Sequence, residues 1–517
     1  MTVTIGVDVG TQGSKAGVYL DDGTCVGTGY AEHVFAYPAA GHVEMDPGQI
    51  EDAVLEALAA AVAQAAAAGV APARVGAVAF SGILCGPVLV DESWTPVRPL
   101  IPFLDVRAQD EVAVLRRDVE PLWVGESGNA TLDTYIPAVT LHWVRNHEPD
   151  VWARVAKVLS LAPYVAGRLA GLRADAAYTD PTHLSGWIIG WDAATATFSE
   201  AQLDALGLDP AITPTVVPST HVVGGLTQEA AARTGLPAGT PLVAGAGDVP
   251  QSNLSAGLLR AGQAVDVAGT ASILTVGVEK IVPALTQVPG MLYSLGTLPG
   301  QSFYWGYVKA GGLSLRWFRD QVLGRAADDD AYRQHDELAA AGAPGAGGVL
   351  FLPYLSGGGP DSPLASGTWL GMTAATGAAE LWRSMLEAIA FEYAEFLRAF
   401  DAAGVPVGEV LAVGGGARSP LWNGIKADVV GVPWRTPSRQ DGAVLADAAL
   451  ARAALGLGPG LAATVAQWVG AGAAAVPDPA RSATYDRLAG VRRALLAGPL
   501  RETFDLTATL RSRKAQP

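Results

Sequence analysis

The sequence predicts an α/β fold in which mixed sheets are covered by helices. Residues 5–20 are typical of two strands joined by a glycine turn, and a helical stretch at Gly48–Ala68 precedes a strand at Val75–Phe80. Strands separated by a helix of this length favour a mixed sheet. A second strand, Gly-Thr turn and strand occurs at residues 264–277, which suggests two lobes of similar plan. A chain of 517 residues, 50% of them hydrophobic, is long enough for roughly two to four domains.

The first hairpin carries a carboxylate, Asp8, close to a turn of small and polar residues. The turn contains Gly10, Thr11, Gln12, Gly13, Ser14 and Lys15. Its glycines allow a tight bend with exposed backbone N–H groups, which together with hydroxyls and a cation suit phosphate. A single carboxylate beside phosphate suits Mg²⁺, which prefers oxygen ligands. The alternative is an ordinary hairpin with a surface aspartate.

The next elements place polar residues directly after apolar runs. Asp46-Pro47 is a cap followed by a first-turn proline, and it starts the helix that ends before Gly69. The apolar run Leu100–Leu104 leads into Asp105 and Arg107, a common position for site residues, although a surface ion pair is equally compatible with this pattern.

A further strand, Pro241–Ala246, ends beside Asp248, and a helix at Gln251–Leu259 is expected to follow. Asp248 could therefore be a site residue or only the N-cap of that helix.

The second half contains three glycine-rich turns. One is Gly269-Thr270 in the second hairpin, and another is Gly311-Gly312 in a predicted helix at Lys309–Gln321. The third joins a short strand, Val410–Val413, to a helix from Leu421 through three consecutive glycines. A strand, a glycine loop and a helix allow a flat ligand to approach the backbone closely.

Composition excludes several classes of function. The net charge of −16 argues against a nucleic-acid surface, and two cysteines without metal-type spacing argue against a disulfide scaffold or a zinc site. The most apolar helical stretch, Ala53–Val70, is interrupted by polar residues and does not resemble a membrane span. The amino end has no basic segment before an apolar one, so we expect a cytoplasmic protein.

Taken in order, these motifs resemble the FGGY family of carbohydrate kinases, most closely its xylulose-kinase-like branch. The matching segments are Asp8–Lys15, Asp105–Arg107, Gly245–Asp248, Gly269-Thr270, Gly311–Trp317, Phe351–Gly357 and Gly414–Trp422 with Ala427-Asp428. The resemblance implies an actin-like fold with two lobes built on ribonuclease-H-like sheets around a central cleft. The amino-terminal lobe, residues 1–255, would bind sugar and phosphate, and residues 256–510 would bind the nucleotide. Residues 511–517 would be a short polar tail.

The resemblance also implies roles for individual residues in ATP-dependent phosphorylation of a sugar. Asp8 would hold Mg²⁺, and Asp248 would be the general base, for which an ordinary carboxyl pKa of ~4 suffices. The residues expected to contact ATP are Thr11, Gln12, Gly13, Ser14, Lys15, Gly269, Thr270, Gly311, Gly312, Gly415, Gly416 and Ala417. Those expected near the sugar are Leu84, Cys85, Asp105, Arg107, Tyr135 and Asp248.

The sequence departs from the family pattern at three places. Leu84 and Cys85 stand where related kinases have a Met-His pair that touches the sugar, so this wall of the sugar site is more apolar, unless the alignment is off by one residue or both side chains pack in the core. The loop Gly358–Pro363 lacks the usual Glu-Arg-Thr-Pro sequence. Asp441 stands where a glutamate usually precedes a glycine.

The predicted function is therefore phosphorylation of a small sugar, and the leading substrate is a pentulose such as xylulose. Ribulose, glycerol, erythritol or another polyol are the alternative substrates. An actin-like ATP-binding regulator without sugar chemistry is the alternative from another class. The expected partners are ATP, Mg²⁺ and a small sugar or polyol, with no nucleic acid and no membrane. A homodimer is compatible with Trp382 and Trp468 at a surface, although core packing explains these residues equally well.

Overall fold

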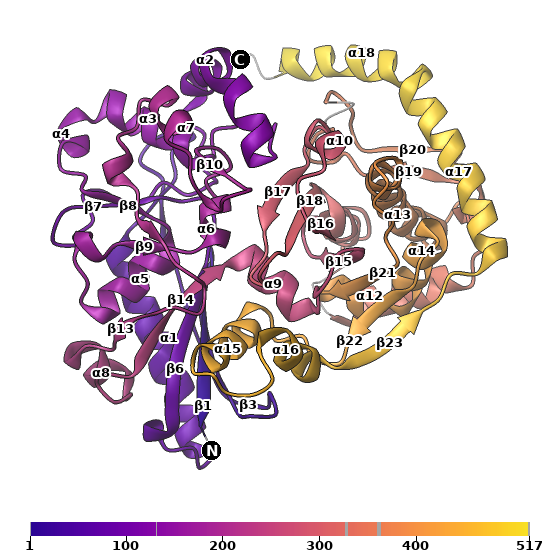
Figure 1. The fold of residues 1–517 in the computed structure, drawn as a ribbon. Coiled ribbons are helices and arrows are strands. Elements are labelled where there is room, and N and C mark those ends of the chain that lie inside the picture. Colours follow the sequence, from indigo (N-terminus) through magenta and orange to yellow (C-terminus); the bar gives the residue numbers. More distant parts are fainter. Residues whose placement is uncertain (1, 131, 326–328, 359–362, 515–517) are drawn as a thin grey trace.

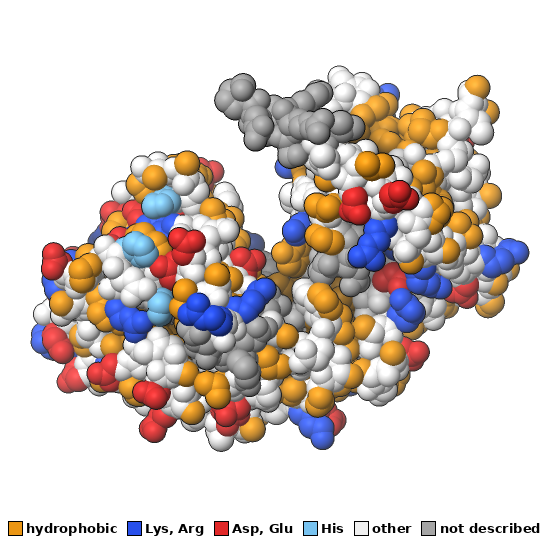
Figure 2. Space-filling model, turned by 90° about the horizontal axis from the view of Figure 1, so that it is seen from above, with side chains coloured by type: hydrophobic (Ala, Val, Ile, Leu, Met, Phe, Trp, Pro, Cys, Tyr) orange, Lys and Arg blue, Asp and Glu red, His pale blue; other side chains and the backbone are white. Residues whose placement is uncertain are grey.

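The structure consists of two mixed sheets, each with its own helices, that lie side by side (Figure 1). It is a computed structural model that describes residues 2–130, 132–325, 329–358 and 363–514. In the space-filling view of Figure 2 the molecule is deeply hollowed between its two halves. Each half has its own buried apolar residues, so each sheet is a scaffold on which loops facing the hollow can be held.

The first sheet has six strands in the order β13-β14-β6-β1-β2-β3 within the described residues. The strands are β1 (Val3–Val9), β2 (Gly13–Tyr19), β3 (Cys25–Glu32), β6 (Val75–Gly82), β13 (Val222–Gly225) and β14 (Pro241–Gly247). β1 is antiparallel to β2 and parallel to β6, and β6 is parallel to β14. The predicted hairpin and the strand after the first helix are thereby confirmed.

The second sheet repeats this plan. Its described order is β17-β18-β16-β15-β21-β22-β23. The strands are β15 (Gln263–Ala268), β16 (Ser272–Val278), β17 (Leu292–Leu295), β18 (Ser302–Val308), β21 (Glu409–Val413), β22 (Trp434–Pro437) and β23 (Ala471–Ala475). β15 is antiparallel to β16 and parallel to β21, as β1 is to β2 and β6. Apart from the additional β17, the two sheets share strand order and strand directions, which supports the internal repeat suggested by the two hairpins.

Helices cover both sheets. The helix α1 (Pro47–Ala67) packs on β3, and Asp46 caps it by accepting a hydrogen bond of 2.8 Å from the amide of Gly48, as its sequence predicts. The long helix α13 (Ala378–Ala402) and α14 (Pro420–Val430) pack against each other beside the second sheet.

One helix crosses from the carboxyl-terminal half to the first sheet. The helix α15 (Ala443–Ala454) packs on β1 and β6, and α16 (Leu461–Val469) follows it. The approach to β1 is close, because a Cβ atom at Gly6 would lie 2.0 Å from the carbonyl oxygen of Val444. Sequence order alone therefore does not separate the two halves, since α15 stabilises the first sheet.

Several predicted elements differ from the structure. The helix α9 (Asp248–Ala256) begins three residues before the predicted start, and α11 (Gly311–Trp317) continues as a π-helical turn at Phe318–Val322. The strand β19 (Leu350–Leu352) is shorter than the strand that the sequence predicts over residues 349–355, and α18 (Pro499–Lys514) extends into the predicted tail.

Trp382 and Trp468 are both 1% exposed, so they pack in the core and do not mark a dimer surface. In the part of the chain that the structure describes, no helix is both long and apolar enough to cross a membrane.

Candidate active site

Asp8 and Asp248 lie at the same edge of the first sheet. β1 and β14 both run parallel to β6, which lies between them, so the carboxyl ends of the three strands meet at one edge. Asp8 is the last residue but one of β1, and Asp248 follows β14 directly. β1 runs from the N-terminus, at the bottom of Figure 1, toward the side from which Figure 2 looks into the hollow. The topology of the sheet thereby brings two carboxylates that are far apart in sequence to the same edge.

The pKa values of both carboxyl groups are raised. Burial is the largest cause for Asp248, the negative charge of Asp8 adds to it, and the pKa rises to about 7. Burial also raises the pKa of Asp8 to about 6, although a hydrogen bond from Ser81 and the charge of Lys15 act in the opposite direction. An ordinary carboxyl pKa of ~4 would suffice for a general base, and in the structure burial and the neighbouring carboxylate raise the pKa of Asp248 above that value.

Asp248 is not the N-cap of the helix that follows it. Gly247 is the N-cap of α9, and Asp248 is the first helical residue. One oxygen of its carboxylate, Oδ1, accepts a hydrogen bond of 2.7 Å from the amide of Val249. The side chain is half-buried, so it is held by the backbone while part of it stays accessible.

A third carboxyl group, Asp447 of α15, lies behind the other two and was not predicted. It is fully buried, and it accepts hydrogen bonds of 2.7 Å from Ser81 Oγ and from Gln251 Nε2. Burial and the charge of Asp8 raise the pKa of Asp447 well above its usual value. Asp447 is the one carboxylate in the apolar run 442–455. A single carboxylate in such a run was the signal in the sequence that could have identified it.

The turn of the first hairpin is partly accessible. Thr11 is half-buried and Gln12 is exposed at the tip, whereas Gly13 is buried as the first residue of β2. Ser14 is fully buried and its hydroxyl forms a 2.8 Å hydrogen bond with Nε2 of His33, so the predicted phosphate contact of this residue would require its side chain to exchange that partner. Lys15 Nζ donates a 2.9 Å hydrogen bond to the backbone oxygen of Asp441, which holds the cation on the Asp8 side of the hairpin.

The predicted nucleotide residues of the second half come together. Gly269 and Thr270 are exposed at the turn between β15 and β16. Their carbonyl oxygens accept 3.0 Å hydrogen bonds from the amides of Gly312 and Leu313, at the start of α11. The contact requires glycine, because a Cβ atom at Gly312 would lie 2.4 Å from the oxygen of Gly269.

The triple-glycine loop lies beside the same turn. β21, which leads into this loop, pairs in parallel with β15, which leads into Gly269. Gly415 is exposed, Gly416 is half-buried and Ala417 is buried. A Cβ atom at Gly416 would lie 2.6 Å from Cβ of Ala268, so only a residue without a side chain fits there.

The predicted sugar wall lies against Asp248. Leu84 is buried and packs against Gly247, where a Cβ atom would lie 2.1 Å from Cδ2 of the leucine. The Cys85 thiol donates a 3.3 Å hydrogen bond to the carbonyl oxygen of Gly186, and burial together with the charge of Asp248 raises its pKa to about 12. Half-buried Tyr135 lies close enough to Cys85 for electrostatic interaction, and burial raises its pKa.

Asp105 and Arg107 form a buried ion pair whose polar atoms face other parts of the first half. The carboxylate of Asp105 accepts hydrogen bonds of 2.6 Å from the amide of Val43 and of 3.0 Å from Arg107 Nε. Arg107 also binds Glu44 at 2.9 Å and lies over the ring of Trp143, 5.0 Å from its centroid. The pair is buried, so it is not a surface ion pair, and its predicted place on the sugar side of the site stays a prediction.

Of the two other departures from the family pattern, only the altered loop falls partly outside the described residues. Residues 359–362 of the altered loop lie outside the described residues. Asp441 accepts a 3.2 Å hydrogen bond from the Tyr19 hydroxyl and, through its backbone, the bond from Lys15.

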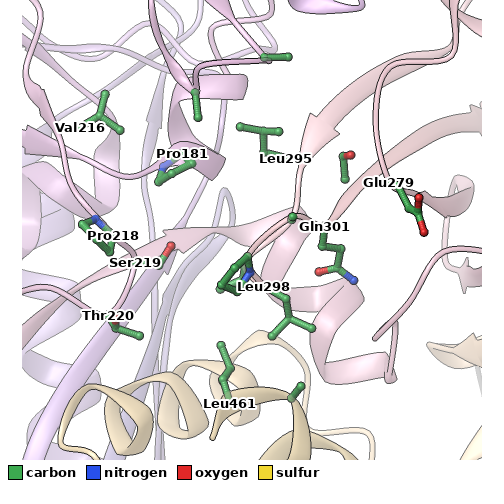
Figure 3. Close-up of a pocket in the computed structure, with 18 of the residues that line it drawn as sticks. Pro181, Val216, Pro218, Ser219, Thr220, Glu279, Leu295, Leu298, Gln301 and Leu461 are labelled. Carbon is green, nitrogen blue, oxygen red and sulfur yellow. The ribbon is translucent and has the colours of Figure 1, made fainter.

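A separate cavity of about 1280 Å³ lies between the two halves and does not include Asp8 or Asp248 in its lining. Figure 3 shows Pro181 and Ser219 on one side, Leu295 and Leu298 on another, and Leu461 below them. Its walls are mostly apolar and come from both halves and from the residues before and within α16. The cavity is therefore distinct from the sheet edge that carries Asp8 and Asp248.

Both halves of the chain match models of one family. Residues 3–255 match the N-terminal domain, and residues 264–455 the C-terminal domain, of the FGGY family of carbohydrate kinases. The chain therefore belongs to this family and is a carbohydrate kinase, a phosphotransferase, rather than an ATP-binding regulator without sugar chemistry.

Individual relatives agree with this assignment. The crystal structure of xylulose kinase from Rhodospirillum rubrum is similar, with 31% identity and a TM-score of 0.86 over 97% of this chain and 100% of that one. The chain is 26% identical over 450 residues to the xylulose kinase of Staphylococcus xylosus, covering 86% of this chain and 89% of the relative. It is 28% identical over 491 residues to the glycerol kinase of Aromatoleum aromaticum, covering 90% and 93%. The actin-like fold is thereby confirmed, while the relatives differ in the substrate that their names give.

Proposed function

We propose that the protein transfers the γ-phosphate of ATP to a hydroxyl group of a small sugar, first of all a pentulose such as xylulose, with Asp248 as the general base. The observation that carries the proposal is the position of Asp248: half-buried, at the sheet edge that also holds Asp8. Phosphoryl transfer depends mainly on positioning and on neutralising charge, and this edge offers both.

The donor groups fit Mg·ATP. Among the described residues, no group of three or more His, Cys, Asp or Glu side chains is arranged to hold a metal by itself. Mg²⁺ in kinases is typically held by one or two carboxylates together with the substrate phosphates, so Asp8 alone is sufficient on the protein side. When bound, Mg²⁺ would neutralise charge on the phosphates.

The glycine turns fit the nucleotide. Thr11, Gln12, Gly269 and Thr270 present accessible turns, one from each sheet, and these would cradle the phosphates. The backbone around Gly311 and Gly312 on one side and Gly415, Gly416 and Ala417 on the other would flank the adenosine. Gly311 packs against the fully buried side chain of Ser272, where a Cβ atom would lie 2.1 Å from Oγ, so only glycine fits at the start of α11.

Asp248 would remove the proton from the attacking hydroxyl. The carboxylate takes one proton as the new O–P bond forms and the bond to ADP breaks. Its pKa of about 7 makes it a better proton acceptor near neutral pH than an ordinary aspartate. Closure of the two halves would exclude water, so that the sugar rather than solvent attacks the phosphate.

The substrate proposal follows from the wall beside Asp248. Leu84 is apolar, and the Cys85 thiol is already bonded to Gly186, so neither offers a strong hydrogen bond to a hydroxyl group. We therefore expect Tyr135 and Asp248 to make the polar contacts with the sugar. The two xylulose kinases among the relatives support a pentulose, and the glycerol kinase supports glycerol or another polyol such as erythritol as the second candidate. A role in the cytoplasm, where ATP is available, is part of the proposal.

The test is ADP formation with Mg·ATP and a panel of xylulose, ribulose, erythritol and glycerol. We expect xylulose to give the highest kcat/KM, and a clear preference for a polyol would replace the pentulose assignment. Asp248→Asn should lower kcat by ~100-fold or more, as loss of a general base does. Asp46→Asn is the matched control, because asparagine caps a helix as well as aspartate and α1 is remote from the chemistry. Turnover of Asp248→Asn within about threefold of the control would exclude Asp248 as the base.

A further inference from the structure

A short buried helix packs directly behind Asp248. The helix α6 (Pro181–Ser185) lies in the first half, and Asp180 is its N-cap. Asp180, Thr182, His183 and Ser185 are all completely buried, although each is polar. Buried polar groups are costly unless their hydrogen bonds are satisfied, so a cluster of this kind needs a physical explanation.

We propose that Asp180 and Thr182 position the carboxylate of Asp248 by fixing the peptide unit in front of it. The Thr182 hydroxyl donates a 2.5 Å hydrogen bond to Asp180 Oδ1 and accepts one of 2.7 Å from the backbone amide of Gly247. Gly247 is the residue immediately before Asp248 and ends β14. This inference rests on the proposed role of Asp248 as the general base.

Asp180 is held in turn by four donors. Besides the Thr182 hydroxyl, its carboxylate accepts hydrogen bonds of 2.9 Å from the amide of Thr182 and 3.3 Å from Ser219 Oγ, and His183 Nδ1 binds its second oxygen. An acceptor with this many partners has little freedom to move, so the threonine hydroxyl is oriented toward the amide of Gly247. The geometry of a single hydroxyl is thus determined by the buried hydrogen bonds around Asp180.

The same helix also contacts the proposed sugar wall. The carbonyl oxygen of Gly186, directly after α6, accepts the bond from Cys85, and a Cβ atom at Gly186 would lie 2.9 Å from Cβ of Leu84. His183 is also close enough to Asp248 for electrostatic interaction. α6 therefore links the general base to the surface on which the sugar would lie.

On the side away from Asp248, the network lies next to the cavity of about 1280 Å³ between the two halves. Pro181 and Ser219, which flank Asp180 in space, line that cavity (Figure 3). Asp180 and Thr182 thus lie between this cavity and Asp248, without being exposed to solvent. Because neither side chain reaches the surface, their hydrogen bonds act inside the protein, where they hold the backbone at Gly247.

The test compares three variants of the full-length protein. Thr182→Val keeps the shape of the side chain and removes the hydroxyl, and Thr182→Ser restores the hydroxyl. Thr234→Val is the matched control. This buried hydroxyl likewise donates one hydrogen bond, to the carbonyl oxygen of Ala230, and accepts one from the amide of Leu236. Thr234 ends α8 (Gln228–Thr234), and the network around Asp180 does not include it.

We expect Thr182→Val to lower kcat by about 10- to 100-fold, because a misplacement of ~1 Å near the chemistry can cost about 100-fold. KM for ATP should stay within about twofold of wild type, since the nucleotide turns are not in this network. Thr182→Ser should recover most of kcat. Thr234→Val should lower the melting temperature about as much as Thr182→Val does, but leave kcat unchanged. If Thr182→Val does not fold, Asp180→Asn, which keeps size and one acceptor, should show a smaller loss of kcat with the same unchanged KM.

Two results would overturn the inference. One is wild-type kcat in Thr182→Val or, where that variant does not fold, in Asp180→Asn. The other is a loss of kcat that Thr182→Ser does not recover and that Thr234→Val matches, because the hydroxyl would then be only structural. Failure of the proposed function is distinguishable, since it would show as normal turnover in Asp248→Asn, whatever the Thr182 variants do.

Discussion

The raised pKa of Asp248 predicts a specific pH dependence of activity. A general base must be ionised to accept a proton, so activity is lost as pH falls through the pKa of the group. Because burial and the charge of Asp8 raise the pKa of Asp248 to about 7, its ionised fraction changes across the physiological range. With an ordinary pKa, the carboxylate would be ionised at every pH above ~5 and activity would not respond.

The magnitude follows from this pKa. A group with a pKa of about 7 is ~9% ionised at pH 6, ~50% at pH 7 and ~91% at pH 8, so kcat/KM for the sugar should rise about tenfold between pH 6 and pH 8. Below pH 6 the decline should become steeper, because Asp8, with a pKa of about 6, is then protonated as well and would bind Mg²⁺ less well.

The assay should measure ADP directly, by chromatography, because coupling enzymes have pH optima of their own. Mg²⁺ and ATP are kept saturating, sugar is varied, and the melting temperature is measured at each pH to show that the protein stays folded. Constant kcat/KM from pH 6 to pH 8, or a half-maximal value below pH 5, would refute the raised pKa as a property of the catalytic base.

Three further predictions concern other parts of the molecule. Asp8→Ala should abolish Mg²⁺-dependent turnover, and calorimetry should show weaker Mg·ATP binding at an unchanged melting temperature; normal turnover would exclude Asp8 as the metal residue. Gly312→Val should raise KM for ATP by about 10-fold or more while leaving KM for the sugar unchanged, because a Cβ atom would lie 2.4 Å from the oxygen of Gly269. Lys426→Met should destabilise the protein by about 3–5 kcal/mol in urea unfolding, since it removes the only cation among the described residues that binds the fully buried carboxylate of Asp266, at 2.5 Å, and leaves the hydrogen bonds from Tyr393 and Trp434. Adding Asp266→Leu to that variant should recover part of the loss, and no recovery would contradict the pairing.

Local backbone features were predicted well from the sequence. The two hairpins, the helix start at Asp46-Pro47 and the glycine turns depend on residues that are neighbours in the chain, so a short window contains the information. The order of the motifs was enough to indicate the family, and the comparisons confirm it. The roles assigned to Asp8 and Asp248 stay predictions until the variants are measured.

Side-chain partners were predicted poorly. Ser14 was expected to face phosphate, but in the structure it bonds to His33 across the sheet, and Asp105 with Arg107 is part of a buried ion-pair cluster. Asp447 and Thr182 were not singled out at all, although both contact elements next to Asp248. Each of these contacts joins residues whose proximity depends on how distant elements pack, and no local pattern encodes it.

The sequence by itself determined the strands, the glycine turns and the order in which they occur, because backbone conformation is governed largely by neighbouring residues. It also determined which residue types are available for phosphate, metal and proton transfer. Only the tertiary structure decided which carboxylates meet and how strongly their pKa values rise, because β6 between β1 and β14 brings Asp8 and Asp248 to one edge, and α15 from the other end of the chain buries that edge. Desolvation and charge repulsion act through space, so they exist only once the chain has folded.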